Sequence, residues 1–521
     1  MKKFICVHGH FYQPPRENPW TGEVDEEPSA APFHDWNERI AKECYEANVR
    51  APFLNAKGEA TTFVNNFKLI SYDIGPTLLS WLKRKNPVTY SAIVQADRES
   101  AAVNHGHGNA LAQVYNHVIL PLAKKRDKFT QIYWGIADFE YHYGRKPAGM
   151  WLSETAVDRE SLAIMAEQGI HYTLLAPHQA KRVRKVGFAS HWQALHHEAV
   201  DSRRAYRILL EGGKLFHIFF YNAPISRAIA FNGLLHSGDQ LANQLMNAFG
   251  RQDSSQLVST ATDGETFGHH HRFGEMAIAY GLKKIQQHHL ARLTNYADFL
   301  ERTGSAWEVD IYENSSWSCS HGVERWRADC GCRLNHEAGW NQKWRAVLRE
   351  AFDWLQDQVD QIFEVQGGKL LKDPWQARNE YIRVILDPAS DMERKKFLSR
   401  NAKRGLLAED ELRIWRLLEA QKFSLFMFTS CGWFFDDISG IEPVQVMKFA
   451  LRAMELVQPD AKNQLEPAFS QILAGAICLR ILFFSSYTSQ YGLNQWRFDV
   501  RRLLSLSHIG RDLAVRTGAL R

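Results

Sequence analysis

Two short segments of the sequence each place a carboxylate directly after an apolar run. Residues 149–155 (GMWLSET) contain Glu154, and residues 261–270 (ATDGETFGHH) contain Asp263. Enzymes that cleave glycosidic bonds commonly use two carboxyl groups, one ionised and one that donates a proton to the leaving oxygen. Burial or a charged neighbour raises the pKa of the second group so that it keeps this proton. The pair indicates glycosidase chemistry. Alternatively, either carboxylate could cap a helix or lie in a solvated loop.

The first half of the chain contains the elements that must position these groups. Short apolar runs that end in polar residues occur at 4–7, 88–94, 149–152, 171–175, 215–221 and 257–261. Their length and composition are typical of buried strands. Residues 110–124 and 158–168, which lie between runs, have a helical pattern. Alternating strands and helices predict a parallel sheet with helical crossovers. The polar residues should then converge at the carboxyl ends of the strands, where such folds bind ligands.

The second half of the chain has a helical pattern from about residue 340 onward. Val444, Met447, Leu451 and Met454 form one apolar stripe at helical spacing. Pro443 and Pro459 bracket this segment as start and stop signals. Residues 407–420 and 472–484 are also predicted to be helical.

The charge, the cysteines and the apolar stretches of the chain bear on its partners and its cellular compartment. The 63 Lys and Arg residues against 58 Asp and Glu residues give a net charge of +5, dispersed along the chain, so no nucleic-acid partner is predicted. Seven cysteines at irregular spacing argue against a disulfide framework and fit a reducing compartment. The N-terminus does not have the pattern of a signal peptide, and the most apolar stretch, 472–484, is too short to span a bilayer. We therefore expect a soluble, cytoplasmic protein with no membrane partner.

Four motifs occur in order along the first 290 residues: HGHFYQP at 8–14, YNHVILPL at 115–122, the stretch 134–154 ending in WLSE, and DGETFGH at 263–269. This series resembles glycoside hydrolase family 57, which comprises α-amylases, 4-α-glucanotransferases and glycogen branching enzymes. GWFFD at 432–436 loosely resembles a Trp-rich motif of the family's helical domain. Two departures, Asn109 where many members have Glu and the unusual segment 97–108, leave the linkage specificity open.

The resemblance implies a distorted parallel (β/α)7 barrel over residues 1–305, followed by a mainly helical domain over residues 306–521 packed on the barrel mouth. It implies that Glu154 is the nucleophile and Asp263 the general acid/base of a retaining reaction. Their carboxyl groups should then lie about 5–5.5 Å apart. The implied substrate is an oligo- or polysaccharide of the α-glucan class, cleaved with water or transferred to a second sugar. No cofactor is expected.

The motifs also supply candidate substrate contacts. Sixteen tryptophans are available, and their flat faces either stack on sugar rings or fill the core. The residues expected to contact substrate are His8, His10, Gln13, His117, Trp151, Glu265, His269, Trp317 and Trp433.

Two other functions stay open at this point. His8 and His10 are alternative metal ligands, which would make the protein a metal-dependent mannosidase-like or deacetylase-like hydrolase. We expect both to face one side only if the strand ends before them, and Asp97, Asp263 or one of residues 269–271 would have to complete the site. The second alternative is a non-catalytic glucan-binding protein.

A cysteine-rich segment forms a separate candidate metal site. Its potential ligands are Cys319, His321, Cys330, Cys332 and His336, four of which would suffice for tetrahedral zinc. Buried free thiols in a loop are the alternative interpretation. The choice between the two stays open from the sequence.

Overall fold

The computed structural model describes residues 2–55, 57–187, 190–196, 199–251, 254–335, 341–462 and 464–476. These residues form two compact units. The first consists of Met1–Gln13, Glu26–Tyr115 and Gln131–Ser318, and the second of Pro14–Asp25, Asn116–Thr130 and the described residues from Cys319 onward.

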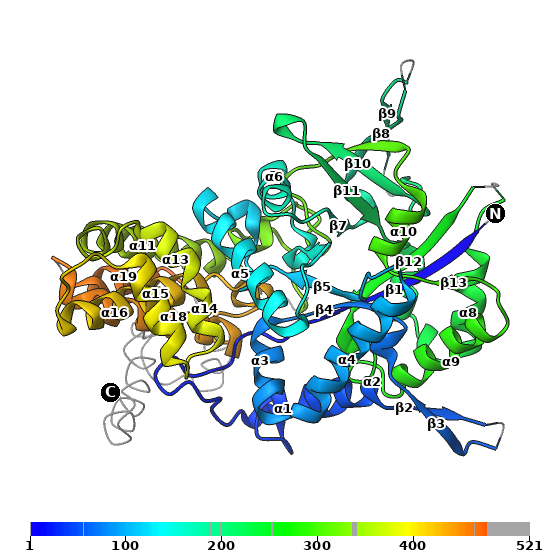
Figure 1. The fold of residues 1–521 in the computed structure, drawn as a ribbon, viewed down its shortest axis with the longest axis horizontal. Helices are drawn as coiled ribbons and strands as arrows, with labels where there is room; N and C mark the ends of the chain where they lie inside the picture. The colour runs from blue at the N-terminus through cyan, green and yellow to red at the C-terminus, as the bar shows by residue number, and fades with distance from the viewer. Residues whose placement is uncertain are drawn as a thin grey trace, which may run out of the picture. The chain divides into compact units, whose positions relative to one another are not determined.

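Parallel strands form the centre of the first unit (Figure 1). In chain order they are β1 (Lys3–Phe11), β4 (Ser71–Ile74), β5 (Ala110–Gln113), β6 (Met150–Trp151), β7 (Tyr172–Leu175), β11 (Leu215–Phe220) and β12 (Gln256–Asp263). Strands β12, β1, β4, β5 and β6 pair in that order, and β7 pairs with β11.

Two further contacts close this arrangement. A parallel bridge between Gly149 and Tyr172 joins the start of β6 to β7. The backbone N–H of Asn222, just after β11, donates to the carbonyl of Ser259 on β12 at 2.7 Å. Each strand therefore neighbours the next one along the chain, and the last neighbours the first. The prediction of a distorted parallel (β/α)7 barrel is confirmed.

Helices connect the strands and cover the barrel. They are α3 (Pro76–Lys85), α4 (Pro87–Val103), α5 (Lys125–Tyr143), α6 (Arg159–Glu167), α7 (Ala223–Phe231), α8 (Gly238–Asn247), α9 (Gly274–Gln287) and α10 (Tyr296–Thr303). Strands β10 (Ala205–Leu209), β14 (Trp307–Ile311), β8 (Ala180–Lys185) and β9 (Gln193–Ala194) extend the sheet beyond β11. The short strands β2 (Ala51–Leu54) and β3 (Ala60–Val64) form a separate antiparallel pair.

Two predicted elements are wrong. Residues 88–94 lie inside α4 and not in a strand, because Asn86 caps the backbone N–H of Thr89 and Pro87 occupies the first turn. Residues 110–124 are not a helix: they contain β5 and a short turn at Leu120–Leu122, and α5 begins at Lys125. The predicted helix at 158–168 agrees with α6.

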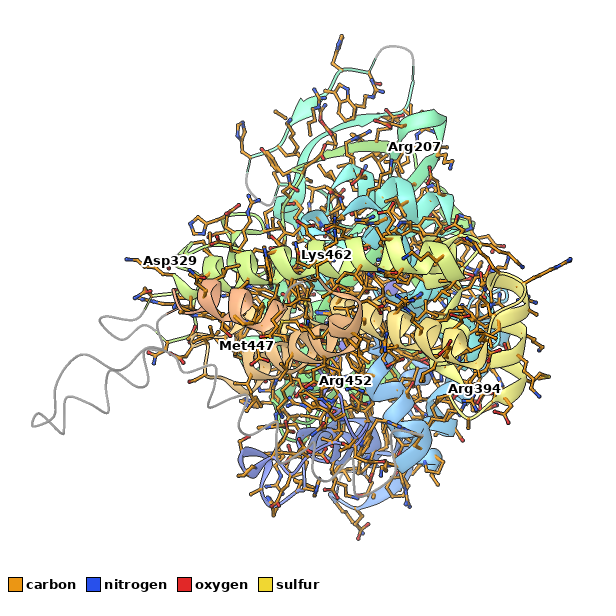
Figure 2. The ribbon with its side chains drawn as sticks, turned by 90° about the vertical axis from the view of Figure 1, so that its left-hand side faces the viewer. Arg207, Asp329, Arg394, Met447, Arg452 and Lys462 are labelled. Atoms are coloured by element: carbon orange, nitrogen blue, oxygen red, sulfur yellow. The ribbon has the colours of Figure 1, made fainter. Side chains whose placement is uncertain are left out.

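The second unit is built of helices. They include α11 (Trp344–Ile362), α13 (Pro374–Glu380), α14 (Ile382–Leu386), α15 (Asp391–Asn401), α16 (Ala408–Phe426), α17 (Cys431–Phe434), α18 (Ile441–Val457) and α19 (Leu465–Leu473). On α18, the labelled Met447 is buried while Arg452 pairs with Glu455 at 3.3 Å (Figure 2). Of the apolar stretch 472–484, residues 477–484 lie outside the described residues. Within the described ranges, none of the helices combines the length and apolar character needed to cross a membrane.

Candidate active site

Glu154 lies three residues beyond the end of β6, in an unusual backbone conformation. Its φ is 57° and that of Thr155 is 50°, so two consecutive non-glycine residues adopt left-handed geometry. Such residues persist only where their surroundings hold them. Here the Thr155 hydroxyl bonds the amide oxygen of Gln179 at 2.9 Å, and the Gln179 amide donates back to the Thr155 carbonyl at 2.8 Å. The turn therefore aims the Glu154 side chain in a fixed direction.

A loop from a distant part of the chain contacts the Glu154 carboxylate. The indole N–H of Trp317 donates to Oε2 at 2.9 Å, and the Ser318 hydroxyl donates to the same oxygen at 2.5 Å. The backbone N–H of Trp317 also donates to the Glu154 carbonyl at 3.0 Å. This loop is fixed in turn by an antiparallel bridge between Val157 and Ser315. Trp317, a predicted site residue, thus lies at the candidate nucleophile.

A buried histidine pair lies beside this carboxylate. His8 Nε2 is 3.0 Å from Asp73 Oδ1, and His10 Nδ1 is 2.8 Å from Asp73 Oδ2. Both imidazoles stack on Trp151, with ring centroids 5.0 and 4.9 Å away. The expectation that the two histidines share a face only beyond the strand end is wrong. Strand β1 continues to Phe11, and residues two apart on a strand point to the same side.

Asp263 lies level with this histidine pair. In the register of the sheet, His10 on β1 pairs with Asp263 on β12 and, on its other side, with Asp73 on β4. Three neighbouring strand ends therefore present an acid, a histidine and an acid. The Asp263 side chain is exposed, whereas His10 and Asp73 are buried.

The charges at these strand ends are coupled. Burial opposes the protonation of His10, but the negative charges of Asp73, Asp263 and Glu154 raise its pKa above the usual value. Burial dominates at His8 and lowers its pKa. At Asp73 the two histidines outweigh burial and lower the carboxyl pKa. Near neutral pH, Asp73 is an anion, and its hydrogen bond favours the cationic form of His10.

Both candidate catalytic carboxyls have raised pKa values. Burial raises that of Glu154, the donors Ser318 and Trp317 lower it, and the charge of Asp263 raises it. The Asp263 side chain is exposed, yet the protein around it removes enough water to raise its pKa. The charge of His10 lowers the pKa of Asp263, and the charge of Asp73 raises it. The site therefore raises the pKa of both acids, and the charge of Asp263 adds to the rise at Glu154.

The other predicted site residues occupy several places. Gln13 donates to Glu265 at 2.5 Å, and His269 Nδ1 is 2.5 Å from Glu43. The remaining two belong to the second unit. There His117 Nδ1 is 2.7 Å from the hydroxyl of Ser430, and Trp433 is fully buried, with its indole N–H donating to the carbonyl of Arg345. These are the contacts of core residues, so they give no support to a substrate contact for Trp433.

Two of the third ligands considered for the metal-hydrolase alternative, Asp97 and His271, have other partners, whereas Asp263 lies level with His10. Asp97 lies on α4, where both its carboxylate oxygens accept hydrogen bonds from Arg145 at 2.8 Å. His271 Nε2 is 2.8 Å from the carbonyl of Ala230. The partner that the two histidines actually share is Asp73, and they use it for hydrogen bonding.

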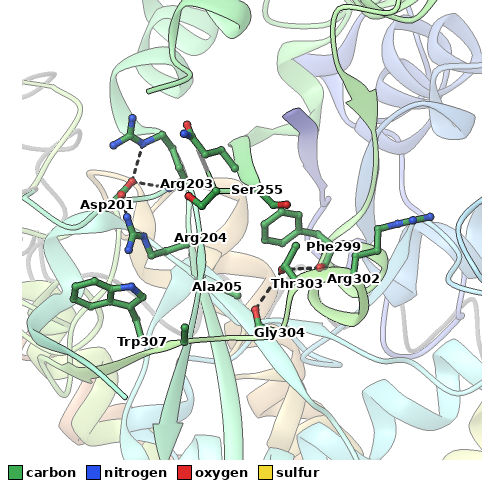
Figure 3. A pocket seen from close by; sticks show the side chains of 13 residues that line it. Asp201, Arg203, Arg204, Ala205, Ser255, Phe299, Arg302, Thr303, Gly304 and Trp307 are labelled. Carbon is green, nitrogen blue, oxygen red and sulfur yellow. Dashed lines mark hydrogen bonds and ion pairs between the residues drawn. The ribbon is translucent and has the colours of Figure 1, made fainter. Parts of the chain in front are cut away.

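A cavity of about 350 Å³ lies at the opposite end of the barrel (Figure 3). Gln256, the first residue of β12, contributes to its lining, together with Asp201, Arg204, Phe299 and others. At about 3.3 Å per residue, the eight residues of β12 place Asp263 roughly 20 Å from this cavity. It is therefore separate from the catalytic candidates.

Comparisons with known proteins agree with this geometry. The model of the family "Glycosyl hydrolase family 57" matches residues 7–311, and a domain of unknown function, DUF3536, matches residues 340–478. A search of the curated proteins found no match. Among solved structures, an exo-type maltose-forming amylase from Pyrococcus sp. ST04 is similar at a TM-score of 0.69 and 17% identity, with 97% of this chain and 88% of that chain covered. A GH57-type branching enzyme from Pyrococcus horikoshii is similar at a TM-score of 0.53 and 13% identity, with 95% of this chain and 98% of that chain covered.

The family match includes β1 from Val7 onward, the other six barrel strands in full, and both candidate carboxylates. The fold of the first unit and the solved structures that it resembles agree with that match. The chain belongs to glycosyl hydrolase family 57 and is an enzyme of the class that hydrolyses or transfers glycosidic bonds.

Proposed function

We propose that this protein is a retaining hydrolase or transglycosylase that acts on α-glucans, with Glu154 as nucleophile and Asp263 as general acid/base. The observation that carries the proposal is the electrostatic coupling of the two carboxyls at the carboxyl ends of the barrel strands, with His10 paired to Asp263 in the sheet. The substrate class is supported by family membership and by the amylase and branching enzyme that the chain resembles. None of the six cysteines in the described part of the chain forms a disulfide, which supports a reducing, cytoplasmic location.

Hydrogen bonding supports the division of roles. Glu154 accepts two hydrogen bonds on one oxygen, and donors of this kind favour the ionised form that a nucleophile needs. No side chain in the described part of the chain hydrogen-bonds the carboxyl of Asp263, whose raised pKa favours the protonated form. An acid that is exposed and protonated is suited to donate to a glycosidic oxygen.

The proposed reaction proceeds in two steps. Asp263 donates its proton to the glycosidic oxygen while a Glu154 oxygen bonds to the anomeric carbon, and the leaving sugar departs with that proton. The glycosyl ester is uncharged at Glu154, so Asp263 loses an anionic neighbour and its pKa falls. Asp263 then accepts a proton from water or a sugar hydroxyl, whose oxygen displaces Glu154 from the anomeric carbon.

Azide rescue tests both roles at once. The variants Glu154→Ala and Asp263→Ala are incubated with a 4-nitrophenyl α-maltooligoside and azide, and the products are identified by NMR. The first variant should give a β-glycosyl azide through one displacement. The second should give the α-azide through two displacements.

Natural glucans supply the second readout. The Asp263→Ala variant should turn them over about 10²–10⁴-fold more slowly than the unmodified enzyme. Glu160→Ala, which changes an exposed carboxylate on α6, is the matched control and should keep full activity. Exchanged azide products would reverse the two roles, and undiminished turnover by Glu154→Ala would refute the proposal.

A further inference from the structure

A cluster of three cysteines and one histidine lies in the second unit, outside the residues used above. Its members are Cys319, His321, Cys330 and Cys332, and their potential ligand atoms all lie within 4.8 Å of one another. The Cys319 sulfur is 3.9 Å from that of Cys330 and 3.8 Å from that of Cys332. His321 Nδ1 is 3.6 Å from the Cys332 sulfur.

The three pair distances match edges of one tetrahedral coordination sphere. With Zn–S bonds of about 2.3 Å and Zn–N bonds of about 2.0–2.1 Å, a tetrahedron separates two sulfurs by about 3.8 Å and sulfur from nitrogen by about 3.5 Å. A disulfide would need a sulfur separation of about 2.05 Å. Because Cys319 is nearly equidistant from both other sulfurs, no pair is favoured. The geometry points to a single Zn²⁺ ion bound by Cys319, His321, Cys330 and Cys332.

The loop conformation explains how so tight a Cys-x-Cys spacing brings its sulfurs together. Gly331, between the two cysteines, has φ +81°, and Gly322 closes the Cys319 turn at φ +86°. Residues with a side chain rarely adopt this backbone geometry, so glycine is the suitable residue at both positions. Gly322 N–H also donates to the carbonyl of Cys319 at 3.1 Å. The two ligand pairs are thus each presented by a turn.

Other residues of the second unit anchor the same segment. The buried Arg345 donates to the carbonyl of Cys332 at 2.9 Å. Asp329, labelled in Figure 2, accepts from the backbone N–H of Gln342 at 3.0 Å. Asp436 accepts from the backbone N–H of Leu334 at 2.8 Å. The ligands are therefore held near their bound arrangement by contacts that do not need the ion.

The donor set also indicates the kind of ion and its role. Soft thiolates with one imidazole select zinc over magnesium or calcium. Four protein ligands fill a tetrahedral sphere and leave no position for a reactive water, so the site is structural. His336 lies outside the described residues, and the four ligands are complete without it. In the chain, Cys319 directly follows Ser318, so a bound ion fixes the backbone next to a residue that contacts Glu154.

Metal analysis of the full chain tests this inference without any activity measurement. Protein purified under reducing conditions should contain one zinc ion per chain by mass spectrometry. Exchange for Co²⁺ should give the intense visible bands of tetrahedral cobalt and thiolate-to-cobalt charge transfer. Cys332→Ser should lose most of the zinc and the charge-transfer intensity. Cys431→Ser, which changes a cysteine outside the cluster, should keep both.

Thiol alkylation keeps the test decisive if Cys332→Ser does not fold. In the unmodified protein, zinc should protect Cys319, Cys330 and Cys332 from alkylation, and a chelator should expose them. Substoichiometric zinc with no tetrahedral cobalt spectrum would overturn the proposal. Equal alkylation with and without added zinc would do the same. Neither readout depends on the proposed glycosidase reaction, so the two proposals fail separately.

Discussion

Removing the Ser318 hydroxyl should move the acidic limb of the pH–activity profile to higher pH. This hydroxyl donates to Glu154 Oε2 at 2.5 Å, and a donor to a carboxylate stabilises its ionised form. In Ser318→Ala the donor is lost, so protonation of Glu154 becomes easier and its pKa rises further. The proposed nucleophile is active only when ionised, so activity at acidic pH should fall first.

The magnitude follows from the strength of this contact. A hydrogen bond to a charged group contributes about 1.5–3 kcal/mol. At 1.36 kcal/mol per pKa unit, its complete loss corresponds to a rise of about 1–2 units. Trp317 still donates to the same oxygen at 2.9 Å, and the charge of His10 still lowers the Glu154 pKa, so the lower end of this range is expected.

The assay is kcat/KM against pH with a chromogenic maltooligoside, because this parameter reports the pKa values of the free enzyme. Ser190→Ala is the control, since that hydroxyl donates within its own loop to the carbonyl of Gly187. At a pH well above the limb, Ser318→Ala should approach the activity of the unmodified protein. An acidic limb that stays in place, or that moves to lower pH, would refute the assignment of Glu154 as the ionised group.

Three further predictions concern stability and packing. Asp73→Asn should lower the melting temperature more at about pH 6 than at about pH 8.5. Asp73 raises the pKa of His10 in the folded protein, and this contributes stability when the pH is below the unfolded pKa of about 6.5. That contribution is lost as the pH rises through the pKa of His10 in the folded protein. Arg378→Met should reduce the free energy of unfolding of the second unit by about 3–5 kcal/mol in urea titrations. In the unmodified protein Arg378 Nη1 is 2.7 Å from Asp127 Oδ1, and the substitution leaves this buried carboxylate without its cation. Adding Asp127→Asn should recover part of the loss. Gly264→Ala should reduce kcat, because the new Cβ would lie 2.4 Å from a buried aromatic ring and shift the adjoining acid/base residue.

The sequence predicted a parallel sheet because most of the strands are short apolar runs with polar residues at their carboxyl ends, and the resemblance to family 57 implied that this sheet closes into a barrel. The run that includes residues 149–152 led to Glu154, and the run 257–261 led to Asp263. The run 88–94 was misassigned because its Val, Thr, Tyr and Ile residues are typical of strands, although they lie on α4. The capping residue Asn86 and Pro87 were the local signals that should have decided for a helix.

Two residues of the site were missed for different reasons. Asp73 lies inside β4 (SYDI), so the rule of searching just after an apolar run passes over it. The period of two in strands was available as a signal, since it places His8 and His10 on one face, where one side chain of a neighbouring strand can contact both. Ser318 carried no such signal, because its contact with Glu154 joins positions 164 residues apart and only the tertiary fold creates it.

The arrangement also changes the role expected of His10. As a substrate contact it would be one donor among several, but its position between two acids gives it a second function. The carboxylates of Asp73, Glu154 and Asp263 repel one another in this partly buried site. Each anion therefore raises the pKa of the other two carboxyl groups. Asp73 is the acid whose pKa is lowered, and through its hydrogen bond it favours the protonated form of His10. That cation then lowers the pKa of both Glu154 and Asp263 and counteracts burial. The buried anion Asp73 therefore acts on the proposed catalytic pair through His10, and this explains why a residue without a direct contact to Glu154 belongs to the site.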